Sequence, residues 1–220
     1  MSLRFLRLAL LASLVAVATV ARAQSPSVTL DRATAAWEKV RTARASFEQT
    51  ITNALTGSSA SARGEFQQQR PGRLAIRFDE PNGDRIVADG KTVWIYLPSS
   101  APGQVVKRPA QDGAAMPIDI TNQFLEDPHG KYDVSAAGTS TVGGRPATGL
   151  VLVPKKAANA PFSRATIWVD DADALIRQFE IVEPSGITRR VRITSLELNV
   201  PVDRDAFAFK LPPGVKVIER

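Results

Sequence analysis

Cysteine is absent from this 220-residue sequence, and histidine occurs once, at His129. Without cysteine the chain has no disulfide framework, so an ordinary packed core must hold the fold. The sequence also lacks a phosphate-binding loop, a spaced set of metal ligands and a nucleophile paired with a base, which are the patterns that mark many active sites. We therefore expect no enzymatic activity, no cofactor and no bound metal.

Two polar segments resemble ligand sites at first sight, but a turn explains each of them. Three aspartates fall within residues 170–173, without the glycine and the distal glutamate of a calcium-binding loop. The single histidine lies in an Asp-Pro-His-Gly sequence. Both compositions are typical of turns, so we interpret the aspartates as a hairpin turn and His129 as part of a solvated turn.

Long hydrophobic runs are missing except near the N-terminus. There the basic start MSLRFLR is followed by the thirteen-residue run LALLASLVAVATV and by Ala21-Arg22-Ala23. This order is typical of a secretory signal peptide, and the run is shorter than the roughly 20 residues of a membrane-spanning helix. We expect residues 1–23 to be removed after export and residues 24–220 to form a single domain.

A strong excess of one charge is also lacking once residues 1–23 are removed. The remaining chain has 25 basic and 22 acidic residues, because the removed segment carries three arginines and no acid. Its basic residues are dispersed and are not interleaved with aromatic ones. Nucleic-acid binding needs a concentrated basic surface, so the sequence does not predict it.

Two segments have the spacing of amphipathic helices. Leu30–Arg44 repeats apolar residues at helical intervals around Trp37. Met116–Glu126 does so through Ile120 and Phe124, and an Asp-Pro pair ends it. The first helix precedes all of the predicted strands, and the second interrupts them.

Alternating apolar and polar residues dominate the rest of the chain and predict about eleven strands in an antiparallel meander. Turn signals rich in glycine, proline, asparagine and aspartate separate them. The alternating segments are Ala45–Thr52, Ala62–Gln69, Leu74–Phe78, Arg85–Ala88, Thr92–Leu97, Gln104–Lys107, Tyr132–Ala136, Ala147–Val153, Arg164–Val169, Leu175–Val182, Ile187–Leu198 and Phe207–Leu211.

Some strands are apolar on both faces, most clearly Val93–Tyr96 and Leu150–Val153. Two arrangements account for this: two sheets packed as a sandwich, or one curved sheet around a hollow that the helices cover. The position of the two helices favours the curved sheet. In Ile187–Leu198 the apolar phase shifts, which predicts a β-bulge that bends the sheet further.

In the segment FQQQRPGRLAIRF, which spans residues 66–78, the side chain of Arg70 is expected on the same face of a strand as apolar side chains. Its Pro-Gly pair predicts a hairpin turn, and Arg70 lies in the phase of Phe66, at the rim of an apolar surface. The interior residues predicted by alternation are Phe47, Phe66, Leu74, Ile76, Phe78, Phe179 and Ile181, joined by Trp37 from the first helix.

Several short motifs stand in a fixed order along the chain. They are Ala45–Gln49, Gly64–Phe66, Arg70–Arg73, Ile86–Tyr96, Val153–Lys155, Ile176–Phe179 and Phe207–Val215. This ordered set resembles the LolA-type family of periplasmic outer-membrane lipoprotein carriers, over nearly all of residues 24–220.

The resemblance implies a mainly β fold, an unclosed antiparallel half-barrel of about eleven strands with a helical lid over an apolar cavity. It implies a monomeric periplasmic carrier that takes acylated lipoproteins from an inner-membrane ABC-type transporter and delivers them to an outer-membrane receptor. The predicted interior residues would line the cavity, and Ile120 and Phe124 would belong to the lid. Arg70 stands where the family places an arginine that bonds to the lid in the empty state.

Other functions fit the same residues. One is a carrier of a different lipid, such as a glycolipid or a polyene-type lipid. Another is a periplasmic sensor whose half-barrel binds a regulatory membrane protein. The chain departs from the family pattern at Asp119 and Thr121, which either face solvent or indicate a different cargo, and at Leu74, where an aromatic residue is usual.

Overall fold

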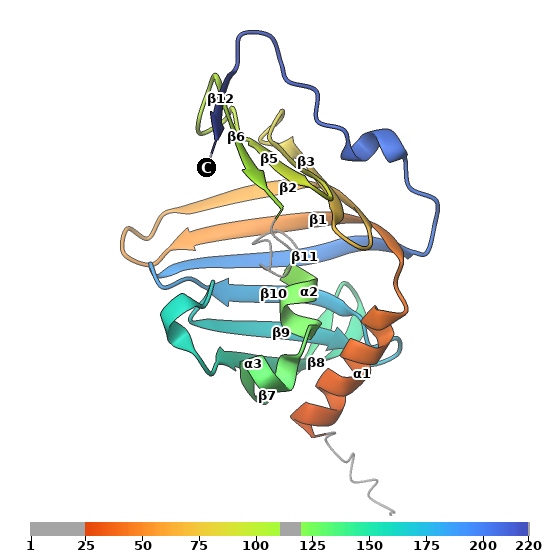
Figure 1. Ribbon diagram of the computed structural model, residues 1–220. Helices are drawn as coiled ribbons and strands as arrows, with labels where there is room; N and C mark the ends of the chain where they lie inside the picture. Colours follow the sequence, from red (N-terminus) through yellow and green to blue (C-terminus); the bar gives the residue numbers. More distant parts are fainter. Residues whose placement is uncertain (1–24, 111–119, 220) are drawn as a thin grey trace, which may run out of the picture.

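One twelve-stranded sheet dominates the computed structural model, which describes residues 25–110 and 120–219 (Figure 1). The expected signal peptide and residues 116–119 of the second expected helix lie outside the described residues. The strands are β1 (Thr42–Asn53), β2 (Ser59–Gln69), β3 (Arg73–Glu80), β4 (Arg85–Asp89), β5 (Thr92–Tyr96), β6 (Gln104–Pro109), β7 (Tyr132–Val142), β8 (Arg145–Pro154), β9 (Arg164–Asp170), β10 (Ile176–Val182), β11 (Ile187–Leu198) and β12 (Lys216–Glu219).

Two meanders meet in the middle of this sheet. The strand order is β12-β6-β5-β4-β3-β2-β1-β11-β10-β9-β8-β7, so β1 joins the N-terminal hairpins to the C-terminal ones through β11. The edge strands β12 and β7 do not pair with each other. The predicted unclosed, mainly β half-barrel is therefore confirmed, and the sandwich alternative is wrong.

Two irregularities bend the sheet near its centre. Between β1 and β11 the register shifts at Phe47, where Thr194 is an additional residue on the β11 side, so the predicted β-bulge is confirmed. Between β2 and β3 the register shifts at Gly64. A Cβ atom at Gly64 would lie 2.1 Å from the carbonyl oxygen of Arg77, so the close backbone approach requires glycine there.

Helix α1 (Pro26–Glu38) begins four residues before the predicted helix and ends earlier than predicted. Ser25 caps it by accepting a hydrogen bond from the Val28 amide, with proline at the first helical position. The predicted end at Arg44 is wrong because residues from Thr42 onward pair with β2 and those from Ala43 onward also pair with β11. Pairing on two sides outweighs the helix propensity of the Ala-Arg-Ala segment.

The second helical region consists of two short helices, α2 (Ile120–Leu125) and α3 (Pro128–Lys131). His129 lies in the short helix α3 and not in a turn, but its side chain is exposed as expected, and its Nε2 atom is 2.6 Å from the Asp31 carboxylate of α1. This contact links α3 to α1. Within the two described ranges, no helix has the length and apolar character needed to cross a membrane.

The C-terminal segment differs most from its prediction, because Phe207–Leu211 is not a strand. Its first residue ends a short 3-10 helix, η2 (Arg204–Phe207), and the chain then runs across the convex side of β3 to β5 (Figure 1). Phe207 packs against Ala75, and the Phe209 ring stacks on Trp94 with centroids 5.1 Å apart. This cover explains why the strand Val93–Tyr96 is apolar on both faces.

The main core lies between the helices and the C-terminal half of the sheet. Leu30 and Ala33 of α1 pack with Phe124 of α2 and with inward-facing residues of β8 and β9, such as Leu150 and Ile167. All five are at most 1% exposed. The helices therefore pack mainly on β7–β10, and Phe66, Ile76 and Phe78 of β2 and β3 are partly buried at the margin of this core.

A buried carboxylate orders the turn between β9 and β10. Asp170 is 1% exposed and accepts hydrogen bonds from Arg145, Arg177 and the Ala172 amide. Burial alone would raise the pKa of Asp170, but these donors outweigh it, so the pKa lies below its ordinary value. Asp170 is thus ionised at neutral pH, and the predicted hairpin turn is held by this network.

Candidate ligand-binding cavity

A cavity of about 320 Å³ lies between helix α2 and the concave face of the sheet. Alternation along β1, β2, β3, β10 and β11 directs every second side chain toward this space. Residues from β4 and from the segment before β9 complete the wall. The predicted interior residues that line the cavity are Phe47, Phe66, Leu74, Ile76, Phe78, Phe179 and Ile181.

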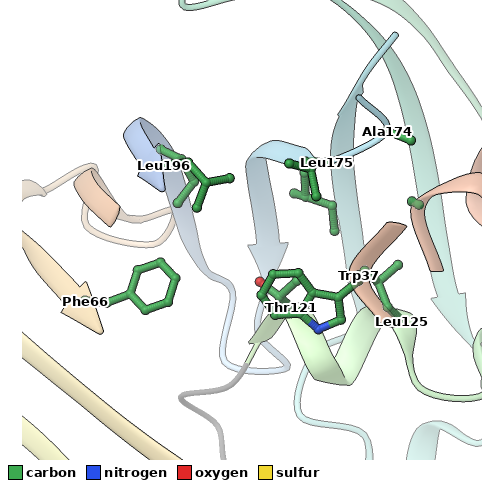
Figure 2. A pocket seen from close by; sticks show the side chains of 10 residues that line it. Trp37, Phe66, Thr121, Leu125, Ala174, Leu175 and Leu196 are labelled. Atoms are coloured by element: carbon green, nitrogen blue, oxygen red, sulfur yellow. The ribbon is translucent and has the colours of Figure 1, made fainter. Parts of the chain in front are cut away.

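Trp37 lines a smaller neighbouring space of about 20 Å³ (Figure 2). Phe66, Thr121 and Ile193 line both spaces, so the two are adjacent. Figure 2 shows Trp37, Thr121 and Leu125 on the helix side and Phe66 on the sheet side. Trp37 is 5% exposed and thus closes this end of the hollow from the helix layer.

The helix-side residues divide between the core and the cavity. Phe124 is fully buried, and its ring centroid lies 5.7 Å from those of Phe162 and Phe179. Phe124 therefore belongs to the core. Thr121 and Gln123 line the cavity, so Thr121 is not a solvent-facing residue. For Ile120 the structure describes only its place as the first residue of α2.

Helix α2 is fastened to the sheet by a buried tyrosine. The Tyr132 hydroxyl donates a hydrogen bond to the Gln123 carbonyl oxygen, 3.0 Å away. Burial raises the pKa of Tyr132 to about 12, so the hydroxyl is a donor at any physiological pH. The bond holds the C-terminal part of α2 beside β7 and leaves the Thr121 end next to the cavity.

Contacts between aromatic rings fix the positions of several side chains in the cavity wall. Phe47 and Phe78 meet edge to face, with ring centroids 5.6 Å apart at an interplanar angle of 89°. This arrangement is favoured over parallel stacking, and it fixes two rings that the sheet alone would leave free to rotate. The Phe179 ring is held on the opposite side by Phe124.

The end of the cavity near the β10–β11 turn is polar, and the sequence reasoning did not identify it. Nη1 of Arg189 donates to Oε1 of Gln49 at 3.1 Å, and Nη2 of Arg189 lies 3.5 Å from the Glu183 carboxylate. All three residues line the cavity. Gln49 shares the phase of Phe47, and Arg189 shares that of Val191, so alternation applied to polar residues would have found them.

Arg70 reaches from the β2–β3 turn to the C-terminal end of α1. Its Nη1 atom donates to the carbonyl oxygens of Trp37 at 3.0 Å and Val40 at 3.5 Å. Its guanidinium carbon lies 5.9 Å from the centre of the Trp37 ring. The Trp37 carbonyl oxygen also accepts the Val40 amide, but a carbonyl oxygen has two lone pairs, and carbonyls at a helix C-terminus carry a partial negative charge that suits a guanidinium.

The described ranges contain no group of three or more histidine, cysteine or acidic side chains placed to hold a metal ion. Ion pairs in these ranges lie mainly on exposed strand surfaces, as Arg63 with Glu80 illustrates. The site is thus a hollow with apolar walls, one polar end and a cationic bridge to a helix. An apolar hollow with a few polar groups of this kind is suited to an amphiphilic molecule, whose apolar part it can bury while the polar groups form hydrogen bonds.

These features define a class of proteins, unclosed β half-barrels whose helices cover an apolar cavity. A profile of the outer membrane lipoprotein carrier protein family, LolA, matches residues 38–210. The outer-membrane lipoprotein carrier protein of Sodalis glossinidius is 32% identical over 177 residues, which cover 80% of this chain and 81% of the relative. The one from Chromobacterium violaceum is 30% identical over 214 residues and 95% of each chain. This chain belongs to the LolA family.

A solved structure shows the same fold at low sequence identity. The crystal structure of an uncharacterized conserved protein from Thermus thermophilus superposes with a TM-score of 0.54 at 14% identity. The likeness covers 88% of this chain and 98% of that one. The overall fold is therefore shared with a protein of very different sequence.

Proposed function

We propose that this protein is a periplasmic chaperone that carries acylated lipoproteins, with their acyl chains in the 320 Å³ cavity. The observation that carries the proposal is this apolar hollow between sheet and helices in a chain of the LolA family. The cargo comes from an inner-membrane ABC-type transporter and goes to an outer-membrane receptor. Residues 1–23 act as the export signal, residues 24–220 form one monomeric domain, and no catalysis is involved.

The cavity must expand to take such cargo. Its volume lies at the lower end of the range for small-molecule pockets, about 300–1,000 Å³. A triacylated anchor has on the order of 40 methylenes, and at about 0.8 kcal/mol each their complete burial would make release too slow. The carrier therefore buries the chains incompletely, and α1 and α2 move away from β2 and β3 to admit them.

Arg70 is the reversible latch of this movement. Apolar surface exposed to water costs about 25 cal/mol per Å², so the empty carrier favours closure. The Arg70 bonds to the Trp37 and Val40 carbonyls add a directional attachment at the rim. A charged hydrogen bond contributes about 1.5–3 kcal/mol, which holds the helix yet allows bound acyl chains to displace it. Closure in turn drives release of the cargo.

A carrier of another lipid is the second candidate. The glutamines Gln49, Gln68 and Gln123 line the cavity, and amide groups of this kind suit a large polar head group such as that of a glycolipid. The same sheet and the same latch would serve that cargo. Only the identity of the bound molecule separates the two candidates.

Native mass spectrometry of the protein purified from its own periplasm makes that separation. We expect a fraction of the molecules to retain a lipoprotein, seen as a mass increase that matches an acylated polypeptide. A retained glycolipid or polyene-type lipid would favour the second candidate. Protein that never retains an acylated or lipidic molecule, even after crosslinking in intact cells, would contradict both.

A further inference from the structure

Arginine side chains lie near both ends of the cavity, Arg70 beyond the lining residue Gln68 and Arg189 within the lining itself. In the inward phase of β2, Phe66 and Gln68 lead to Arg70 at the β2–β3 turn, where the guanidinium binds the end of α1. In the inward phase of β11, Val191 is preceded by Arg189 near the β10–β11 turn. These turns lie at opposite ends of the central strands (Figure 1).

Arg189 is fixed in place but retains donor capacity. Its Nη1 atom donates one hydrogen bond to Gln49, and its Nη2 atom forms an ion pair with Glu183. A guanidinium has five N–H donors, so neither contact exhausts the group. The Arg189 side chain is 31% exposed, and Gln49 is 9% exposed. Arg189 thus lies where the cavity opens to water, and its contacts with Gln49 and Glu183 hold the guanidinium there.

We propose that Arg189 and Gln49 form a binding site for the ester or amide carbonyl oxygens that join acyl chains to the polar part of the cargo. This inference rests on the proposed carrier function. The apolar walls bind the chains, and the N–H groups at the polar end donate to the first oxygens beyond them. The cargo is thereby oriented with its chains toward Arg70 and its polar part emerging at the β10–β11 turn.

The neighbouring carboxylate makes carbonyl oxygens the fitting ligand. Glu183 lies 3.5 Å from the guanidinium and offsets its charge. An anionic phosphate at this place would approach a carboxylate, whereas a neutral carbonyl would not be repelled. Carbonyl oxygens need only donors, and Arg189 and the Gln49 amide supply them. The site therefore selects for neutral linkages at the boundary between chain and head group.

A matched pair of probes tests the proposal. One is a lipopeptide with two palmitoyl ester chains on a glyceryl-cysteine, and the other is the same peptide with two ether-linked hexadecyl chains, which lack the carbonyl oxygens. We expect the parent protein to bind the ester probe about tenfold more tightly, a difference of about 1.4 kcal/mol. Arg189→Met should bring the two dissociation constants within about twofold and leave the ether probe bound as before.

Arg190→Met is the control, because Arg190 lies next to Arg189 on β11 but pairs with Glu180 on the outer face. It should keep the ester preference. Equal affinity of the parent protein for both probes, or an unchanged preference in Arg189→Met, would overturn the proposed carbonyl site and leave the carrier function standing. If neither probe binds to the parent protein, the carrier function itself fails.

Discussion

An Arg70→Leu variant is expected to load cargo as well as the parent protein does and to hand it over at least about tenfold more slowly. Its closed state lacks the hydrogen bonds to the Trp37 and Val40 carbonyls. Even half of the 1.5–3 kcal/mol of one charged hydrogen bond shifts the open-to-closed ratio several-fold, and the leucine adds apolar surface at the rim. Both changes stabilise the open, loaded state.

The measurement is a transfer assay with labelled lipoprotein, from preloaded carrier to the outer-membrane receptor. Arg73→Leu is the matched control, because Arg73 lies across the same turn, is exposed and contacts Gln69 instead of the helix. Its transfer rate should equal that of the parent protein. Equal rates for Arg70→Leu and the parent would mean that Arg70 is an ordinary turn residue with no role as a latch.

An Ile193→Glu variant is expected to weaken binding of acylated cargo by about 100-fold or more. Ile193 lies on β11 and lines both the main cavity and the small space beside Trp37. A carboxylate there removes apolar contact and must lose water when acyl chains enter, and an unpaired buried charge costs several kcal/mol. Without cargo the side chain stays hydrated, because Ile193 is only partly buried.

Thr194→Glu adds the same charge one residue further along β11. Thr194 is the bulge residue and is exposed, so its variant should bind cargo as the parent protein does. Fluorescence titration with a labelled lipopeptide compares the three proteins, and circular dichroism checks that each is folded. Folded Ile193→Glu with unchanged affinity would show that acyl chains bind somewhere other than the cavity.

Strand alternation predicted much of the sheet, because the central strands β1–β3, β10 and β11 each direct apolar side chains toward a shared hollow. Phe47, Phe66 and Ile181 follow this rule, and all three line the cavity. The phase shift in Ile187–Leu198 predicted the bulge that the register shows. The local sequence was sufficient to predict these features, because a buried strand face accepts mainly apolar residues.

The end of α1 and the packing on the convex face of the sheet could not be predicted from local sequence, because contacts between residues far apart in the chain determine them. Residues 43 and 44 have helical propensity but pair with β2 and β11, more than 20 and 150 positions away. Phe207 and Phe209 alternate as in a strand, yet they pack on Ala75 and Trp94 from outside. The polar end was missed because Gln49 and Arg189 are inward-facing polar residues, and the prediction considered apolar ones only.

Photocrosslinking from inside the cavity tests the central claim most directly. A benzoylphenylalanine at position 181 replaces Ile181 on the cavity wall, and one at position 180 replaces Glu180, which pairs with Arg190 on the outer face. On irradiation of cells that produce each variant, we expect adducts with acylated lipoproteins from position 181 and none above background from position 180. Equal adducts from both positions, or none from position 181, would contradict a carrier that holds acyl chains in this cavity.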